Sequence, residues 1–227
     1  MTSVAETRWR GDSPSRPSHV VVVAPHPDDE VLGCGITLSR WQRAGSSIVI
    51  VGCTDGESSH PRSNAITQRE LRERRSVERW DAFDALGLDP VVQRLGLPDG
   101  RLGEHVEALA AALVRWSGVP DVVLISPWEH DDHPDHQAAA RAADLAAARW
   151  GGRSWHVPIW GKVRPPRPFT GRVATLELGV SDRQCKQKAV SCYATQLVPV
   201  GAGPHDGPVI HPDELDAMLD GTEVLLR

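Results

Sequence analysis

The chain has 227 residues, of which 40% are hydrophobic and 24% are charged, and its formal net charge is −5. This length and composition fit a single globular α/β domain with a core of its own. The negative balance leaves no overall basic face to neutralise a phosphate backbone, so nucleic acid is not expected as a partner.

The four cysteines, Cys34, Cys53, Cys185 and Cys192, form no C-x-x-C pair. They are typical of reduced thiols in a cytosolic protein. The sequence contains no secretory hydrophobic region and no apolar run long enough to span a bilayer. We therefore expect a cytoplasmic protein that is neither exported nor inserted into a membrane.

Residues 1–18 are polar and lack an apolar period, so we expect a flexible N-terminal tail ahead of one domain at 19–227. The domain opens with His19–Ala24, a β-branched run typical of a strand buried on both faces. A helix is expected from the acidic segment 25–30 to about Arg43, followed by a second buried strand at Ser47–Gly52.

Strands and helices alternate over the rest of the chain. A charged helix at 67–86 ends at Gly87, as expected for a helix C-cap. Further strands are predicted at 91–95, 121–125, 154–160 and 172–178, and further helices at 102–116, 134–150, 182–193 and 212–219. This alternation predicts a single-domain, Rossmann-like α/β fold with a mostly parallel sheet and helices on both faces.

Titratable side chains follow each of the first four predicted strands. They lie at 26–30, at 54–57, at Asp99 and at 129–136. Ligands of open parallel sheets bind beyond the carboxyl ends of the strands, so we expect these side chains to converge at one edge.

His26, Asp29 and His136 are candidate metal ligands. A catalytic zinc takes three protein ligands and keeps one position for water. His26 and Asp29 lie three residues apart at a strand-to-helix turn, and His136 lies at the start of another predicted helix. Two imidazoles and a carboxylate suit zinc or another divalent first-row ion, which would polarise an acyl oxygen and lower the pKa of bound water to about 7.

Hydrolysis also requires a base and an acid. Asp28, beside a candidate ligand, is the predicted general base, and His133 is the predicted acid or oxyanion stabiliser. We expect the carboxylate of Asp135 or Asp131 to contact the second ring nitrogen of His133, on the side away from the substrate.

Each pattern alone has a simpler explanation. An Asp-Asp-Glu run at a helix start usually caps the helix and complements its dipole. A His-x-x-His pair is often two surface histidines. Neither explanation accounts for two histidine-containing clusters that both follow buried strands, so the metal site is favoured.

The segments 25–33 and 133–136, about 100 residues apart, resemble the PIG-L/LmbE-like family of zinc-dependent N-acetylglucosamine deacetylases. Weaker similarity extends through 54–57, 75–78 and 188–196. The resemblance implies a Rossmann-like fold and a small-molecule amino-sugar or glycoside substrate. It also implies zinc bound by His26, Asp29 and His136, with Asp28 as general base and His133 as acid and oxyanion partner.

The resemblance places Arg75 and Asp99 where members of the family contact substrate. Glu57, at the end of the second strand, is a further candidate for substrate binding. Trp128 follows the fourth strand and Trp160 ends a later one, so either ring could face a sugar.

The sequence therefore predicts a zinc-dependent deacetylase that removes an N-acyl group, with acetyl as the main expectation, from an amino sugar or a glycosylated small molecule. One alternative is hydrolysis of another amide, as in thiol-conjugate amidases. A metal phosphoesterase is less favoured, because the ligands suffice for one metal and no glycine-rich phosphate loop lies near the site. A metal-binding protein without turnover would not need both Asp28 and His133. The sequence gives no indication of the oligomeric state.

Overall fold

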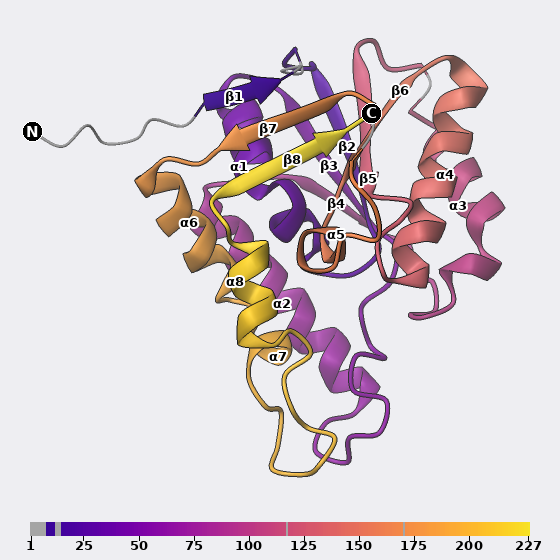
Figure 1. Ribbon diagram of the computed structural model, residues 1–227. Helices are drawn as coiled ribbons and strands as arrows, with labels where there is room; N and C mark the ends of the chain where they lie inside the picture. Colours follow the sequence, from indigo (N-terminus) through magenta and orange to yellow (C-terminus); the bar gives the residue numbers. More distant parts are fainter. Residues whose placement is uncertain (1–7, 12–14, 117, 170) are drawn as a thin grey trace, which may run out of the picture.

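A computed structural model describes residues 8–11, 15–116, 118–169 and 171–227 of the chain. These residues form an eight-stranded sheet in the order β1-β7-β8-β6-β5-β2-β3-β4 (Figure 1). The strands are β1 (Arg8–Gly11), β2 (His19–Ala24), β3 (Ser47–Gly52), β4 (Val91–Arg94), β5 (Val122–Pro127), β6 (Arg153–Val157), β7 (Val173–Glu177) and β8 (Thr222–Leu226). The sheet is parallel from β6 to β4, whereas β8, β7 and β1 pair antiparallel.

Strand β2 shows how the sequence builds a sheet that is buried on both faces. Side chains of a strand alternate between its two faces. Val20 and Val22 pack into the hydrophobic cluster on one face, and Val21 and Val23 pack into the cluster on the other. All four are at most 2% exposed, which explains why the strand is an uninterrupted apolar run rather than an alternating one.

Helices cover both faces of the sheet, which confirms the predicted fold class. Helices α1 (Asp29–Arg43), α2 (Gln68–Leu86) and α6 (Val180–Val190) lie on one face, and α3 (Val106–Val114) and α4 (Pro134–Trp150) lie on the other (Figure 1). The shorter elements are η1 (Leu102–Glu104), α5 (Trp160–Val163), α7 (Ala194–Leu197) and α8 (Pro212–Met218).

Two strands were not predicted. Strand β1 lies within the segment expected to be a flexible tail, where Arg8 and Arg10 both form ion pairs with Glu177 on β7. Residues 1–7 and 12–14 of that segment lie outside the described residues. Strand β8 lies between β7 and β6 and pairs antiparallel with both. The strand predicted at 154–160 ends earlier, because Trp160 begins α5.

The kink in α1 is stabilised by a buried carboxylate. Cys34 has non-helical angles, φ −150° and ψ 23°. Glu223 on β8 accepts the backbone N–H groups of Ile36 and Thr37 at 2.9 and 2.8 Å. Its charge is balanced by the Lys186 ammonium at 2.8 Å. Strand β8 thereby supplies hydrogen-bond acceptors for the second half of α1. Asp29 lies in the first turn of the same helix.

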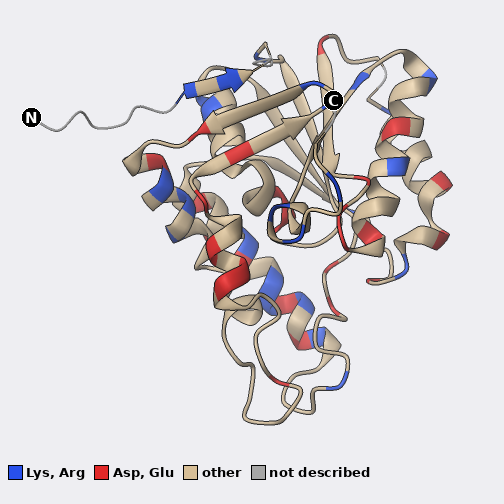
Figure 2. Cartoon of the chain, viewed as in Figure 1, with Lys and Arg blue, Asp and Glu red and all other residues tan. Residues whose placement is uncertain are grey.

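The charges are mixed over the surface. Lys and Arg are interspersed with Asp and Glu along helices such as α2 (Figure 2). None of the helices built from described residues has both the length and the apolar content needed to cross a bilayer.

Candidate metal and catalytic site

The loops that follow β2, β3, β4 and β5 meet at one end of the sheet and form the inner end of a cavity of about 350 Å³. The polar residues at this end are His26, Asp28, Asp29, Asp99, His133 and His136. The predicted convergence of four strand ends is therefore present in the structure, as expected for a parallel sheet.

The three predicted metal ligands lie side by side. Asp29 bridges the two histidines, with Oδ2 at 3.2 Å from Nδ1 of His26 and Oδ1 at 3.2 Å from Nε2 of His136. All three side chains are buried. Nitrogen atoms of His26, His133 and His136 also lie within 4.8 Å of one another, so His133 is close enough to contribute to the same site.

Neighbouring carboxylates fix the orientation of the His26 and His136 rings. Asp131 accepts from Nδ1 of His136 at 2.8 Å, which leaves Nε2 of His136 for a metal. Asp99 and Asp135 lie 3.1 and 3.4 Å from Nε2 of His26, which leaves Nδ1 for a metal. Such partners of ligand histidines set the tautomer and strengthen the ligand. The expectation that Asp135 or Asp131 holds His133 is therefore wrong, since their carboxylates orient His26 and His136 instead.

A second group of possible ligands, His26 with Asp99 and Asp135, is less suited to a metal. Both oxygens of Asp135 already accept backbone N–H groups, from Leu102 at 3.0 Å and Gly100 at 2.8 Å. Asp99 accepts the backbone N–H of Ser58 at 2.8 Å. Both carboxylates of this second group thus have backbone partners, and Asp135 does not line the cavity, whereas Asp29, His133 and His136 do.

The electrostatics of the group around Asp29 favour a bound cation. Burial lowers the pKa of His136, but Asp29 and Asp131 outweigh it and raise the pKa to about 9. Burial also opposes the rise of the His26 pKa, which hydrogen bonds to Asp135, Asp29 and Asp99 nevertheless move well above its usual value. Burial would raise the pKa of Asp29, yet the two histidines hold it well below its ordinary value. The donor set and its excess of carboxylates therefore fit a divalent metal.

Asp28 lies at the N-cap position of α1, yet its side chain makes no capping hydrogen bond. Its backbone is in an unfavourable conformation, with φ 148°. Burial raises the pKa of Asp28 to about 7, against the opposing charge of Arg75. The simpler explanation of this acidic run as a helix cap is therefore wrong for Asp28.

Arg75 lines the cavity, but its described hydrogen bonds go to the protein. It donates to the backbone oxygens of Gly56 and Pro27 at 3.0 and 2.9 Å, and to Oδ2 of Asp28 at 3.1 Å. The side chain is only 3% exposed. Arg75, predicted to contact substrate, is thus placed to hold Asp28 and the strained turn around it.

His133 is the N-cap of α4, and its Nδ1 accepts the backbone N–H of Asp135 at 3.2 Å. A ring nitrogen that accepts a hydrogen bond carries no proton, so Nε2 is the donor of the neutral ring. Burial, with the neighbouring His26 and His136, lowers the pKa of His133 to about 4. This arrangement favours a neutral His133 that donates a hydrogen bond, which suits the predicted role of oxyanion stabiliser better than that of acid.

Two other predicted substrate contacts lie away from the cavity. Glu57 is buried and accepts from Arg72 and from the backbone N–H of Asp99. Trp128 packs against Phe169 with ring centroids 5.1 Å apart. Of the two tryptophans considered for a sugar ring, only Trp160 lines the cavity, and so does the predicted contact Asp99.

Part of the site was missed because it comes from the weakly patterned C-terminal region. Residues that line the cavity without having been predicted include Ile159, Gln196, Val209, Ile210 and Met218. Most are apolar, so composition alone did not distinguish them from core residues. The one available signal was Gln196, at the end of the similarity over 188–196.

The family model of PIG-L, described as GlcNAc-PI de-N-acetylase, matches residues 21–147. A 1D-myo-inositol 2-acetamido-2-deoxy-alpha-D-glucopyranoside deacetylase of Kineococcus radiotolerans is 29% identical over 91% of this chain and 65% of its own length. The chain thus spans slightly less than two thirds of that relative.

Solved structures show the same fold. A conserved protein of Thermus thermophilus has a TM-score of 0.64 and 28% identity, covering 92% of this chain and 93% of its own. The zinc-inhibited form of teicoplanin deacetylase Orf2 has a TM-score of 0.67 with 16% identity, covering 92% and 98%. At that identity the second likeness concerns the fold alone.

Proposed function

Because the chain belongs to the PIG-L family, whose model is described as a GlcNAc-PI de-N-acetylase, we propose that it is a metal-dependent hydrolase that removes an N-acetyl group from an amino sugar. Zinc is the proposed metal. A cytoplasmic location is part of this proposal, and the four free cysteines support it.

The observation that carries the proposal is the position of Asp28. It is a buried, uncapped carboxylate next to Asp29, and its pKa of about 7 lies near the value that suits a general base at neutral pH. A protein that only bound a metal would gain nothing from a strained acidic residue at this place.

His26, Asp29 and His136 would hold the metal, which when bound would act as a Lewis acid towards the acyl carbonyl. Asp28 takes a proton from the attacking water as the new C–O bond forms. His133 donates from Nε2 to the oxygen on which charge develops. Asp28 then delivers its proton to the departing nitrogen as the C–N bond breaks, giving the free amine and acetic acid, which loses its remaining proton to solvent to become acetate.

The names of similar proteins support an amino-sugar substrate. The Kineococcus relative is named for the deacetylation of a glucosamine-type sugar linked to inositol. Asp99 and the Ser58 and Ser59 segment give the cavity a polar side that suits sugar hydroxyls. Hydrolysis of another amide, as in thiol-conjugate amidases, remains the alternative.

The test is the release of acetate and free amine from a panel of N-acetyl amino sugars and their glycosides, with simple N-acetyl amides as the comparison. Turnover should depend on a bound metal and should be lost, together with that metal, in His136→Ala. Hydrolysis of the simple amides alone would favour the amidase alternative. Full turnover by metal-free protein would rule out the proposed mechanism.

A further inference from the structure

The cavity has two chemically different sides. The inner end carries the histidines and carboxylates described above. Another part of the lining consists of apolar side chains from α1, the β6–α5 connection, the loop after α7 and the end of α8. Its members are Leu32, Ile159, Trp160, Val209, Ile210 and Met218, referred to here as the apolar wall.

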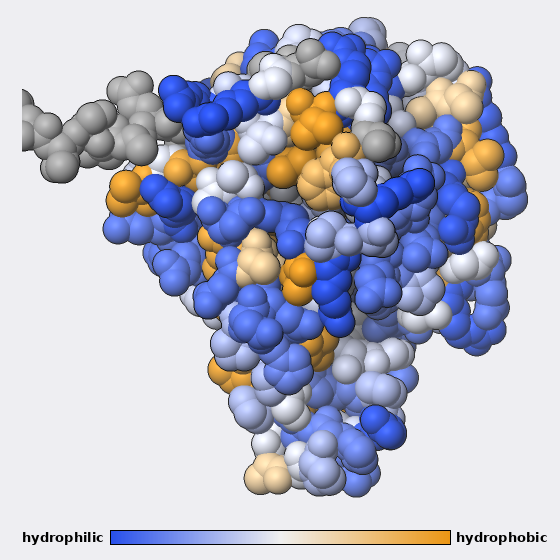
Figure 3. All heavy atoms as spheres, viewed as in Figure 1, coloured by the Kyte–Doolittle hydropathy of each residue, from blue (hydrophilic) through white to orange (hydrophobic). Residues whose placement is uncertain are grey.

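The apolar wall is the edge of the main hydrophobic core where that core meets the cavity. Leu32, Ile159, Ile210 and Met218 belong to one cluster and are at most 5% exposed. Leu32 follows Asp29 by one helical turn, so the apolar wall begins beside the proposed metal. The face seen in Figure 3 is mostly hydrophilic with separate hydrophobic patches.

The apolar wall is tied to the metal centre by Asp131. The carboxylate that orients His136 also accepts the backbone N–H groups of Ile159, Trp160 and Gly161, at 3.1, 3.2 and 2.7 Å. The start of α5 therefore has a fixed position relative to His136. A ligand held at the metal would meet this part of the wall at a defined distance.

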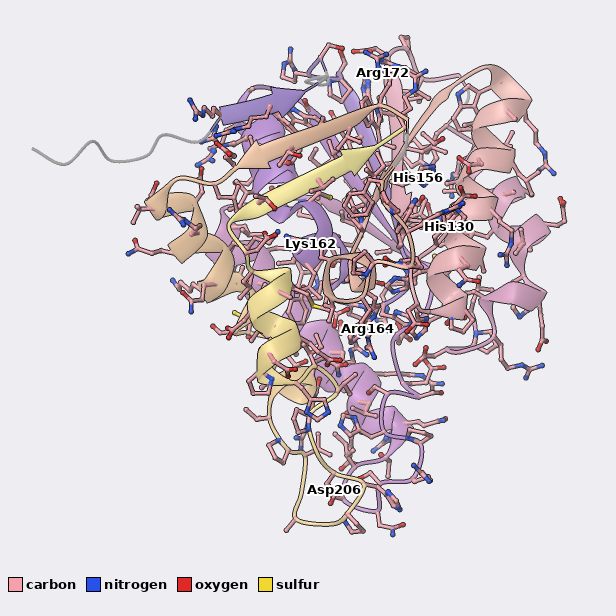
Figure 4. The ribbon with its side chains drawn as sticks, viewed as in Figure 1. His130, His156, Lys162, Arg164, Arg172 and Asp206 are labelled. Atoms are coloured by element: carbon pink, nitrogen blue, oxygen red, sulfur yellow. The ribbon has the colours of Figure 1, made fainter. Side chains whose placement is uncertain are left out.

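Lys162 fixes the other half of the apolar wall. Its ammonium donates to the backbone oxygens of Met218 and Thr222 at 3.2 and 2.9 Å and pairs with Asp220. Lys162 thus joins α5 to the end of α8, where the chain leads into β8 (Figure 4). Val209 and Ile210 are held in turn by the backbone oxygen of Gln196, at 2.9 and 3.0 Å.

A bare amino sugar matches the Trp160 ring but not the aliphatic side chains of this wall. Leucine, isoleucine and valine side chains cannot hydrogen-bond to sugar hydroxyls, and a methionine sulfur is only a weak acceptor, so hydroxyls placed against them would lose their water without adequate replacement. An alkyl or aryl group placed there would instead remove apolar surface from water on both sides. The fixed, buried wall therefore indicates a substrate with polar and apolar parts.

We propose that the apolar wall binds an apolar chain or ring carried by the amino-sugar substrate, and that it makes the enzyme selective for such substrates. The inference rests on the proposed deacetylase function and defines its substrate class. The apolar group is either the aglycone or an acyl chain longer than acetyl.

Two matched series of compounds distinguish these sources. One varies the glycoside of N-acetylglucosamine from methyl to hexyl, and the other varies the acyl group of methyl glucosaminide from acetyl to hexanoyl. For the metal-loaded protein we expect both kcat/KM and the association constant from calorimetry to rise about tenfold or more along one series. The series that shows the rise identifies the source.

Val209→Thr and Met218→Gln place polar atoms on the apolar wall with little change of shape. We expect each to reduce the gain from the hexyl or hexanoyl group about fivefold or more, where the gain is the ratio of kcat/KM to that of the methyl glycoside of N-acetylglucosamine with the same variant. Val173→Thr, at a half-buried valine on β7 outside the cavity, is the control and should keep the full gain.

Binding and turnover separate this inference from the proposed function. A gain in affinity along one series without turnover would support the apolar wall and contradict the deacetylase. Turnover of the methyl glycoside with no gain in either series, or a gain that both wall variants retain, would overturn the inference and leave the deacetylase intact.

Discussion

Asp28 combines an unfavourable backbone conformation with a buried carboxylate. Arg75 donates both to the backbone oxygen of Pro27, just before Asp28, and to the Asp28 carboxylate. Residues held in such conformations concentrate at functional sites, where the surrounding structure compensates for the strain. Asparagine keeps the shape of Asp28 but cannot accept a proton from water.

For Asp28→Asn we expect kcat to fall about 10²- to 10⁴-fold, the range for loss of a general base, with the bound metal retained near wild-type content. Acetate release and elemental analysis of the same sample give both values. Asp132→Asn, at an exposed acid in the loop before α4, is the matched control and should change neither. Turnover within about twofold of wild type in Asp28→Asn would show that another group is the base.

Asp99 has two possible roles, and one substitution distinguishes them. It orients His26 at 3.1 Å and also lines the cavity. If the main role of Asp99 is to orient His26, Asp99→Asn should weaken metal binding about tenfold, as expected for a carboxylate that contacts the second nitrogen of a ligand histidine. Competition with a chromophoric chelator measures this affinity.

Asp55→Asn is the comparison for Asp99, since Asp55 also follows a strand but pairs with the outer residues Arg72 and Arg94. It should leave metal affinity unchanged. A raised KM in Asp99→Asn with normal metal affinity would return Asp99 to its predicted role as a substrate contact.

At the scale of the elements, the junction of α1, α6 and β8 depends on a buried ion pair. Glu223→Gln would leave the Lys186 ammonium buried without its counter-charge and would weaken the acceptors at the α1 kink. Breaking such a pair from one side costs about 3 kcal/mol or more. We expect a loss of this size in the free energy of unfolding, measured by denaturant titration.

Glu177→Gln is the control for this prediction, because Glu177 pairs with two arginines at the surface. Surface pairs contribute little, so the unfolding midpoint should stay close to that of wild type. Equal destabilisation by both substitutions would contradict the role given to the buried pair.

The sequence predicted those elements whose pattern depends on burial. Strand β2 is an apolar run because it packs on both faces. The bounds of α2 were predictable for a different reason, since it has a capping box at Thr67 and Glu70 and is followed by a C-cap at Gly87. Strand β1 lacks such a pattern, since it is held by backbone pairing and by arginines that bind Glu177. Strand β8 carries a buried Glu223 within an apolar segment, and the use of that carboxylate depends on α1 and α6.

The site was predictable to a similar degree. The grouping of His26, Asp29 and His136 followed from the position of their loops after parallel strands. The assignment of carboxylates to particular histidines was not predictable, because Asp131 and Asp135 lie near both His133 and His136 in sequence and only the geometry distinguishes their partners. The apolar wall lacked a signal, since its residues are of the same types as those of the core.

At the scale of the whole molecule, the metal-free protein should remain folded. Without a cation, His26 and His136 are still paired with Asp29, Asp99, Asp135 and Asp131, so their buried polar groups keep partners. We expect chelation to abolish turnover while the far-ultraviolet circular dichroism at about 25 °C stays unchanged. The thermal midpoint should fall, because a ligand of the native state no longer stabilises it.

Added zinc should restore both turnover and the thermal midpoint, and cobalt or iron is expected to substitute to differing degrees. Incubation with chelator already saturated by zinc is the control for direct effects of the chelator. Loss of the circular dichroism signal on chelation would show that the metal is required for the fold itself.

The position of β8 between β6 and β7 also matters while the protein is being synthesised. A ribosome releases the parallel strands and all the metal-binding loops long before residues 222–226, yet β7 and β1 can join the sheet only through this late strand. A nascent chain therefore exposes an open edge at β6 until residues 222–226 emerge, and such edges are prone to aggregation. We expect chaperones that act on newly made chains to raise the soluble yield of this protein.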